Sequence, residues 1–219
     1  MLNLSRQRAR ARLLELRSNN PSTVVPPDIG IHDGLIIDKD NWVRMWVDNC
    51  QMVQTHCGTI SAYRGVSFDG RDLWLVRHLD KTQGYHSQAR DVGEAIREAE
   101  IAWAERKRVR RRWPEVEMLA SELLAGRRKL NIVIQDAYES ALCEIGVRSF
   151  MRRIGLGRVE RLPGRIVALL MKIEPQVGFV IFRAWEREQG LPPAIPAQAE
   201  TRSSESSRRT AHDAIGLAH

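Results

Sequence analysis

Apolar and polar residues alternate along the segment NWVRMWV, which covers residues 41–47. The apolar positions are Val43, Met45 and Val47, and the residues between them are Arg44 and Trp46. In a strand, side chains with a period of two point to opposite faces of the sheet. The segment therefore predicts a β-strand with one apolar face.

A second pattern of this kind predicts a β-hairpin. The runs GTISAYRGVSF and RDLWLVRHL stand on either side of Asp69-Gly70. Asp-Gly between two apolar runs is a strong hairpin signal, because a two-residue turn needs backbone angles that glycine adopts without strain. We therefore expect strands across about residues 31–90, with a turn at Asp69-Gly70.

The apolar period changes to that of a helix from Asp91 onward. Residues 91–112 place small and aromatic apolar residues on one helical face: Val92, Ala95, Ile96, Ala99, Ala102 and Trp103. Pro114 suits the first turn of a new helix, and Gly126 suits its end. Residues 131–154 and 163–189 are also expected to be helical, and residues 1–18 to form a short helix.

These patterns predict an α+β protein. It has a small antiparallel β-sheet over about residues 31–90, a helical half over about 91–189 and a disordered C-terminal tail rich in Pro, Ser and Arg. The expected divisions are a basic N-terminal segment and linker (1–30), a β-sheet plus helix domain (31–112), a helical domain (113–190) and the tail (191–219).

Charge directs attention to anionic partners. The chain has 219 residues, 43% of them hydrophobic, and a formal net charge of +7; its isoelectric point is about 9.8. A basic excess of this size favours nucleic acid or an anionic membrane surface as partner. A GC-rich genome, which enriches arginine, is an alternative explanation for part of the arginine content.

Other features indicate a soluble cytoplasmic protein. Three cysteines, Cys50, Cys57 and Cys143, are too few for a disulfide framework and fit a reducing compartment. The N-terminus lacks the apolar core of a signal peptide. The longest apolar stretch, 166–182, is interrupted by Lys172, Glu174 and Pro175, so no membrane span is expected.

Two clusters of basic residues are the main candidates for phosphate contacts. The first ends the helix predicted at 91–112 and contains Arg106, Lys107, Arg108, Arg110, Arg111 and Arg112. The second contains Arg148, Arg152, Arg153, Arg158, Arg161 and Arg165. Close like charges destabilise a helix by a few tenths of a kcal/mol per pair, roughly, and a bound polyanion relieves this repulsion. The alternative is that both clusters are only solvated.

Residues 62–79 and the helix after them resemble the AP2-type DNA-binding domain and the related arm-binding domains of phage integrases. The matching residues are Tyr63-Arg64-Gly65-Val66, Trp74 and the helix GEAIREAEIAW, within about residues 60–105. The resemblance implies three short antiparallel strands on one helix, with the sheet in the major groove of DNA. It implies that Arg64 and Trp74 contact DNA, with Arg77 beside them on the same strand.

The sequence departs from that family after Trp74, because KTQGYHSQA (81–89) replaces the usual Gly-aromatic strand. Independently of any family, Arg64, Arg71, Trp74 and Arg77 offer charge and flat aromatic surface, which phosphate contacts and base stacking both need. The alternative is a hairpin whose Trp packs inward while its arginines are solvated.

The sequence carries no recognisable catalytic or metal motif. The candidate zinc ligands are Cys50, His56, Cys57, His78 and His86, but their spacing matches no compact zinc site. Phosphate-binding glycine loops, GxSxG and HExxH are absent from the sequence. We therefore expect neither a metal nor another cofactor.

Three functions remain open on the sequence alone. The first is a non-enzymatic protein that binds DNA or RNA, DNA before RNA, as a regulatory or accessory factor such as a transcription regulator of a mobile element. The second is a protein-interaction adaptor whose helical half presents an apolar surface made of Ile166, Leu169, Leu170, Phe179, Ile181 and Phe182. The alternative is that these six residues form the hydrophobic core of the helical half. The third is an enzyme whose site is not recognisable; the oligomeric state is left open.

Overall fold

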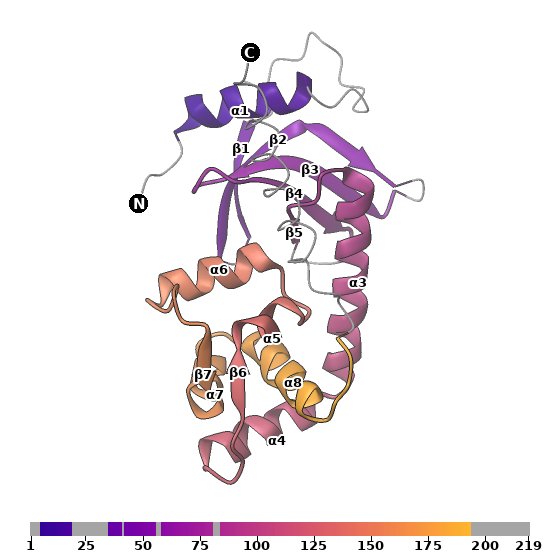
Figure 1. Cartoon of the computed structure of the whole chain (residues 1–219). Helices are drawn as coiled ribbons and strands as arrows, with labels where there is room; N and C mark the ends of the chain where they lie inside the picture. Colours follow the sequence, from indigo (N-terminus) through magenta and orange to yellow (C-terminus); the bar gives the residue numbers. More distant parts are fainter. Residues whose placement is uncertain (1–4, 19–34, 41, 56–57, 81–83, 194–219) are drawn as a thin grey trace, which may run out of the picture. The chain divides into compact units, whose positions relative to one another are not determined.

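The computed structural model describes residues 5–18, 35–40, 42–55, 58–80 and 84–193 (Figure 1). The predicted linker from residue 19 and the predicted tail from residue 194 lie outside the described residues. The chain forms two compact units. Unit 1 contains the described residues up to Arg108 together with Leu142–Val159, and unit 2 contains Val109–Ala141 and the described residues from Glu160 onward.

Unit 1 is built on a five-stranded antiparallel sheet in which each strand pairs with the next along the chain. Its strands are β1 (Leu35–Asp40), β2 (Val43–Gln54), β3 (Ile60–Ser67), β4 (Asp72–His78) and β5 (Tyr85–Ser87). An irregularity between Asp48 and Met52 shifts the register of β2 against β3. With the helices that follow, this sheet confirms the α+β prediction.

The hairpin predicted at Asp69-Gly70 is confirmed. Val66 pairs with Asp72 at the end of the β3–β4 ladder. The Gly70 N–H donates a hydrogen bond to the Ser67 carbonyl oxygen over 2.8 Å. Gly70 has φ of 86°, in the left-handed region that a side chain disfavours. Glycine at this position therefore closes the turn.

Both faces of this sheet are covered by helices. Trp46 and Val66 are register partners and share one face; there they pack with Ala9 and Leu13 of α1 (Arg6–Ser18). The opposite face carries Met45, Val47, Leu73 and Leu75, which pack with Ile145 of α6 (Glu144–Arg153). Figure 1 shows α1 and α6 on opposite sides of the sheet.

A third helix, α3 (Val92–Arg111), is placed against β4 and β5 by polar and aromatic contacts. The Ser87 hydroxyl donates to Glu98 over 2.6 Å. The Trp103 ring meets the His78 ring edge-on, with the ring centroids 5.6 Å apart. The small residues Ala95, Ala99 and Ala102 are fully buried, as the helical period predicted.

Unit 2 is helical apart from a two-stranded antiparallel sheet. Its elements are α4 (Trp113–Leu124), β6 (Asn131–Val133), α5 (Ile134–Tyr138), β7 (Arg161–Pro163), α7 (Gly164–Met171) and α8 (Val177–Glu188). Helices α4, α7 and α8 pack against one another. A side chain at Gly164 would put its Cβ 2.9 Å from the Leu130 carbonyl oxygen, so the start of α7 requires glycine.

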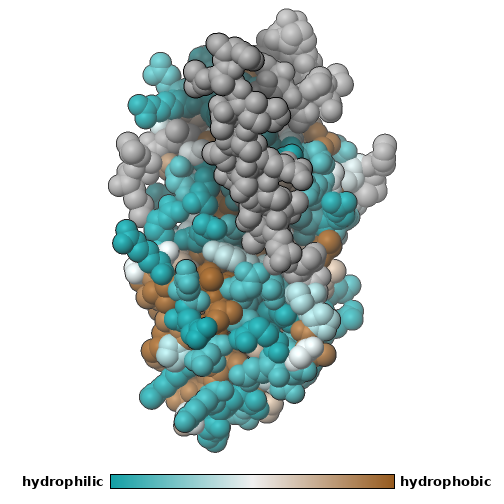
Figure 2. Space-filling model, viewed as in Figure 1, coloured by the Kyte–Doolittle hydropathy of each residue, from teal (hydrophilic) through white to brown (hydrophobic). Residues whose placement is uncertain are grey.

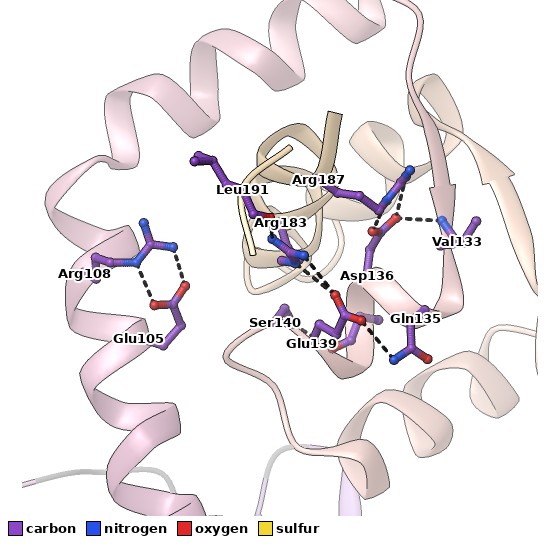
Figure 3. A network of polar contacts seen from close by, with 11 residues as sticks. Glu105, Arg108, Val133, Gln135, Asp136, Glu139, Ser140, Arg183, Arg187 and Leu191 are labelled. Atoms are coloured by element: carbon purple, nitrogen blue, oxygen red, sulfur yellow. Dashed lines mark hydrogen bonds and ion pairs between the residues drawn. The ribbon is translucent and has the colours of Figure 1, made fainter. Parts of the chain in front are cut away.

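Ion pairs tie α8 to α5 within unit 2 (Figure 3). Arg183 and Glu139 lie 3.0 Å apart and both are largely buried. The Asp136 carboxylate is completely buried. It accepts hydrogen bonds from Arg187 over 2.6 Å and from the Val133 N–H over 2.8 Å. The hydrogen bond to Asp136 raises the pKa of Arg187 above its ordinary value.

The helical half differs in detail from the expected run of long helices. Residues 131–133 form a strand because they pair with residues 161–163. The segment 163–189 is split into α7 and α8, and Pro175 lies in the break between them. Residues 142–159, expected in the helical domain, belong to unit 1, so the observed division is not a single cut along the chain.

Candidate nucleic-acid interface

The β3–β4 turn and helix α6 bring two arginines of unit 1 to one carboxylate. Arg152 Nη2 lies 3.0 Å from Asp69 Oδ2, and Arg71 Nε lies 3.5 Å from the same oxygen. The Ser67 hydroxyl donates to the other oxygen of Asp69. Burial raises the pKa of Asp69, but the hydrogen bonds from Ser67 and Arg152 and the charge of Arg71 outweigh it, so the pKa lies below its ordinary value.

Arg153, the next residue of α6, lies over an aromatic ring. Its guanidinium carbon is 5.4 Å from the centroid of the Trp42 ring. The Trp42 ring in turn meets the Phe150 ring edge-on, with centroids 5.0 Å apart. A guanidinium over an indole face is attracted by the negative potential of the ring. This contact places an exposed cation beside a partly exposed, flat aromatic side chain.

Arg148 extends the cationic side of α6 by one turn. It lies four residues before Arg152 and pairs with Glu144 over 2.6 Å. We name the group formed by Arg71, Arg148, Arg152 and Arg153 the α6 cationic surface. Three of these guanidinium groups pair with two carboxylates, Asp69 and Glu144, and the fourth, that of Arg153, lies over the Trp42 ring. Each guanidinium has five N–H donors in a planar arrangement that matches carboxylate and phosphate oxygens.

The basic run at the end of α3 has two kinds of residue. Arg108 makes a two-point ion pair with Glu105, and Arg112 makes one with Glu115. In unit 2, the Arg112 guanidinium also lies 4.8 Å from the centroid of the Phe182 ring. These two arginines therefore have local structural roles, which their position in a run of charges did not reveal.

The other cations of this run face solvent. Lys107, Arg110 and Arg111 are exposed, and none of their side chains forms an ion pair with any residue that the structure describes. Residues three and four apart are neighbours on a helix, so Lys107 lies beside Arg110 and Arg111 on α3. We name these three residues the α3 cationic face. Arg106 is half-buried.

The sheet residues singled out by the AP2 resemblance are placed differently from what it implies. Trp74 is fully buried. Arg64 is its register partner on β3 and lies over its ring, 4.5 Å from the centroid; burial lowers the pKa of Arg64. A nucleic-acid base cannot reach a side chain with no exposed surface, so we leave Trp74 out of the proposed interface. Arg77, near the end of β4, is exposed.

This pair also explains why an open reading face is absent from the described sheet. Arg64 and Trp74 project to the face of Val66, which packs with α1. The opposite face packs with Ile145 of α6. The cationic groups lie instead at the β3–β4 turn and on helices. The amino-acid sequence alone does not indicate that Arg71 and Arg152 lie close together. Trp42 is not among the candidate residues derived from the sequence, because nothing in its local pattern indicates the contact with Arg153.

Neither a metal centre nor a membrane span is found in the part of the chain that the structure describes. It contains no group of three His, Cys, Asp or Glu side chains placed to hold a metal ion. His56 and Cys57 lie outside the described residues. None of the described helices combines the length and the apolar character that crossing a bilayer needs.

Comparison with known proteins does not place the chain in a family. No family model matches it, and neither the curated proteins nor the solved structures contain a significant match.

Proposed function

We propose that the protein binds nucleic acid without catalysing a reaction and acts as a regulatory or accessory factor. The α6 cationic surface of unit 1 contacts phosphates. The observation that carries the proposal is the convergence of Arg71 and Arg152 on Asp69, next to Arg153 on Trp42. These contacts bring residues that are far apart in the sequence together in one basic cluster that includes an aromatic side chain.

The ion pairs of this surface orient the arginines before any ligand arrives. The pKa of Asp69 lies below its ordinary value, and its carboxylate accepts a hydrogen bond from Arg152 Nη2 over 3.0 Å. A side chain that is already ordered loses less conformational entropy when it binds. The remaining N–H groups of Arg152 match the geometry of phosphate oxygens, and Arg148 places a second planar guanidinium one helical turn away.

Trp42 adds an element that phosphate contacts alone lack. An indole beside a phosphate-binding arginine allows a base or a sugar to pack on its ring, as in proteins that bind single strands. The α3 cationic face supplies further exposed positive charge for the phosphate backbone. DNA remains our first expectation for the ligand, and RNA is the direct comparison in the experiment below.

The experiment measures binding of the full chain to labelled duplex DNA, single-stranded DNA and RNA by fluorescence anisotropy, at several salt concentrations. We expect the affinity to fall as salt rises, with a slope of roughly 0.9 in log–log terms for each duplex phosphate contacted. The test variant is Arg148→Gln/Arg153→Gln, which removes two positive charges from the α6 cationic surface. It should bind more weakly, with a slope shallower by up to about 1.8.

A matched control removes the same charge elsewhere. Arg127 and Lys129 are exposed cations of the segment between α4 and β6 in unit 2, so Arg127→Gln/Lys129→Gln also changes the net charge by two. The proposal requires this control to keep the parental salt slope. Equal losses in both variants would show attraction by net charge alone, and no binding of any of the three ligands at low salt would overturn the proposal.

A further inference from the structure

Helix α7 in unit 2 has an exposed apolar stripe. Ile166, Leu169 and Ile173 have exposed fractions of 40%, 44% and 64%. Lys172 keeps helical backbone angles, and the Ile173 N–H donates to the Leu170 carbonyl oxygen over 3.0 Å, so the helical turn continues past Met171. The spacing of i, i+3 and i+7 therefore puts all three side chains on one face.

This stripe is distinct from the core side of the same helix. Val167 and Ala168 are buried, and they face the interior of unit 2. Of the apolar residues considered from the sequence, Phe179, Ile181 and Phe182 of α8 are buried as core, whereas Ile166 and Leu169 are not. Figure 2 shows hydrophobic side chains exposed between hydrophilic ones on the visible face of the structure. Single exposed apolar residues are ordinary, whereas contiguous exposed apolar patches are typical of interaction surfaces.

Cations line one side of this stripe. Arg165 lies four residues before Leu169, and Lys172 lies three residues after it, so both are neighbours of Leu169 on the helix surface. Arg161 precedes them on β7. All three are exposed, and within the described part of the chain none of their side chains forms an ion pair. Helix α7 therefore exposes a row of apolar side chains next to a row of positively charged ones.

We propose that the α7 stripe docks an acidic, amphipathic helix of a partner protein. The apolar face of such a helix covers Ile166, Leu169 and Ile173, and its carboxylates meet Arg165 and Lys172. A second copy of this chain fits less well, because the same cations would be brought toward each other. Nucleic acid fits less well too, since its phosphate backbone offers no apolar surface to the stripe.

This surface is independent of the proposed nucleic-acid interface. The α6 cationic surface belongs to unit 1, and the stripe belongs to unit 2. Each can therefore fail in experiment without the other. Together the two sites describe a protein that binds nucleic acid and recruits a second protein.

The test uses the full chain and a fluorescently labelled helical peptide of about 16 residues, with Leu spaced i, i+3, i+4 and i+7 and Glu on the flanking positions. A second peptide carries Lys in place of Glu. We expect the acidic peptide to bind at least about tenfold more tightly than the basic one. Leu169→Ser/Ile173→Ser should weaken binding of the acidic peptide by about tenfold or more.

Two further variants make the result specific. Met118→Ser removes an equally exposed apolar side chain from α4, on the side opposite its buried residues, and should leave peptide affinity unchanged. Arg165→Glu/Lys172→Glu should reverse the preference, so that the basic peptide binds more tightly. Circular dichroism and urea unfolding of each variant check that the fold persists, which the exposure of the changed residues favours.

Several results would overturn the proposal. One is no binding of the acidic peptide by the parent protein, and another is binding that these substitutions leave unchanged. Stripe-dependent sedimentation with phosphatidylglycerol vesicles but not with peptide would show a membrane surface instead. Stripe-dependent dimers in analytical ultracentrifugation, without peptide binding, would show that a second copy is the occupant.

Discussion

Arg152 and Asp69 are 83 residues apart in the sequence, yet their side chains are joined by a hydrogen bond of 3.0 Å. This contact connects helix α6 to the β3–β4 turn and places Arg152 beside Arg71. It also makes part of the stability of unit 1 dependent on the ionisation of one carboxylate.

That carboxylate predicts a pH dependence. The pKa of Asp69 is lower in the folded protein than its ordinary value of about 3.9. Its contribution to stability is therefore full above about pH 4 and is lost as the pH falls through the folded-state pKa. Because the side chain is about a third exposed, the contribution should stay below about 1 kcal/mol.

Urea unfolding of the parent and of Asp69→Asn at pH 7 and about pH 3 measures this effect. Asp69→Asn should be less stable than the parent at pH 7, and the difference should shrink at the lower pH. A difference that stays constant between the two pH values would mean that the charge of Asp69 does not contribute.

Asp136 should matter more than Asp69, because it is completely buried and accepts hydrogen bonds from Arg187 and from the Val133 N–H. Asp136→Ala leaves both donors without their acceptor, and we expect a loss of about 3 kcal/mol in the free energy of unfolding. Arg187→Ala removes a partly exposed partner and should cost less. Urea unfolding of both variants gives the order, and a larger loss for Arg187→Ala would contradict it.

Gly164 should tolerate no side chain. In Gly164→Ala the new Cβ would lie 2.8 Å from Leu123 Cδ2 and 2.9 Å from the Leu130 carbonyl oxygen, and the second contact involves backbone. Overpacking of this kind typically costs about 1–3 kcal/mol. Gly93→Ala, near the start of α3, is a suitable control, because its nearest contact is the exposed Asp91 side chain at 3.3 Å. Equal stability of the two variants in urea would contradict the expected clash.

The basic run at the end of α3 should separate into binding and structural residues. Lys107→Gln/Arg110→Gln/Arg111→Gln removes the α3 cationic face and should change the free energy of unfolding by less than about 0.5 kcal/mol. It should also reduce the salt slope of nucleic-acid binding. Arg112→Gln removes the pair with Glu115 and the contact with Phe182, and should cost about 1 kcal/mol. Stability and anisotropy measured on the same preparations decide this; a destabilised triple variant would assign these residues a structural role.

Local features were predictable from the sequence because neighbouring residues alone decide them. Asp69-Gly70 makes a turn through the backbone freedom of Gly70, and Pro114 and Gly126 mark the ends of α4 through their own allowed angles. The helical period predicted α3 to within about two residues at each end. The α+β class followed from the change in period at Asp91. The two basic clusters were likewise visible as sequence.

Tertiary packing alone decided which of those residues share a surface. Nothing in the sequence distinguishes Trp74, which is buried under Arg64, from Trp42, which is partly exposed under Arg153. The same holds for α7 and α8, whose apolar residues have similar spacing although only those of α7 include an exposed row. Whether a side chain is buried depends on which distant segment packs over it. Residues 142–159, for example, belong to unit 1 although the preceding residues 109–141 belong to unit 2. The local pattern of apolar residues predicts whether a segment is a helix or a strand. Which other segment it packs against, and hence which surface it exposes, depends on contacts between segments far apart in the chain.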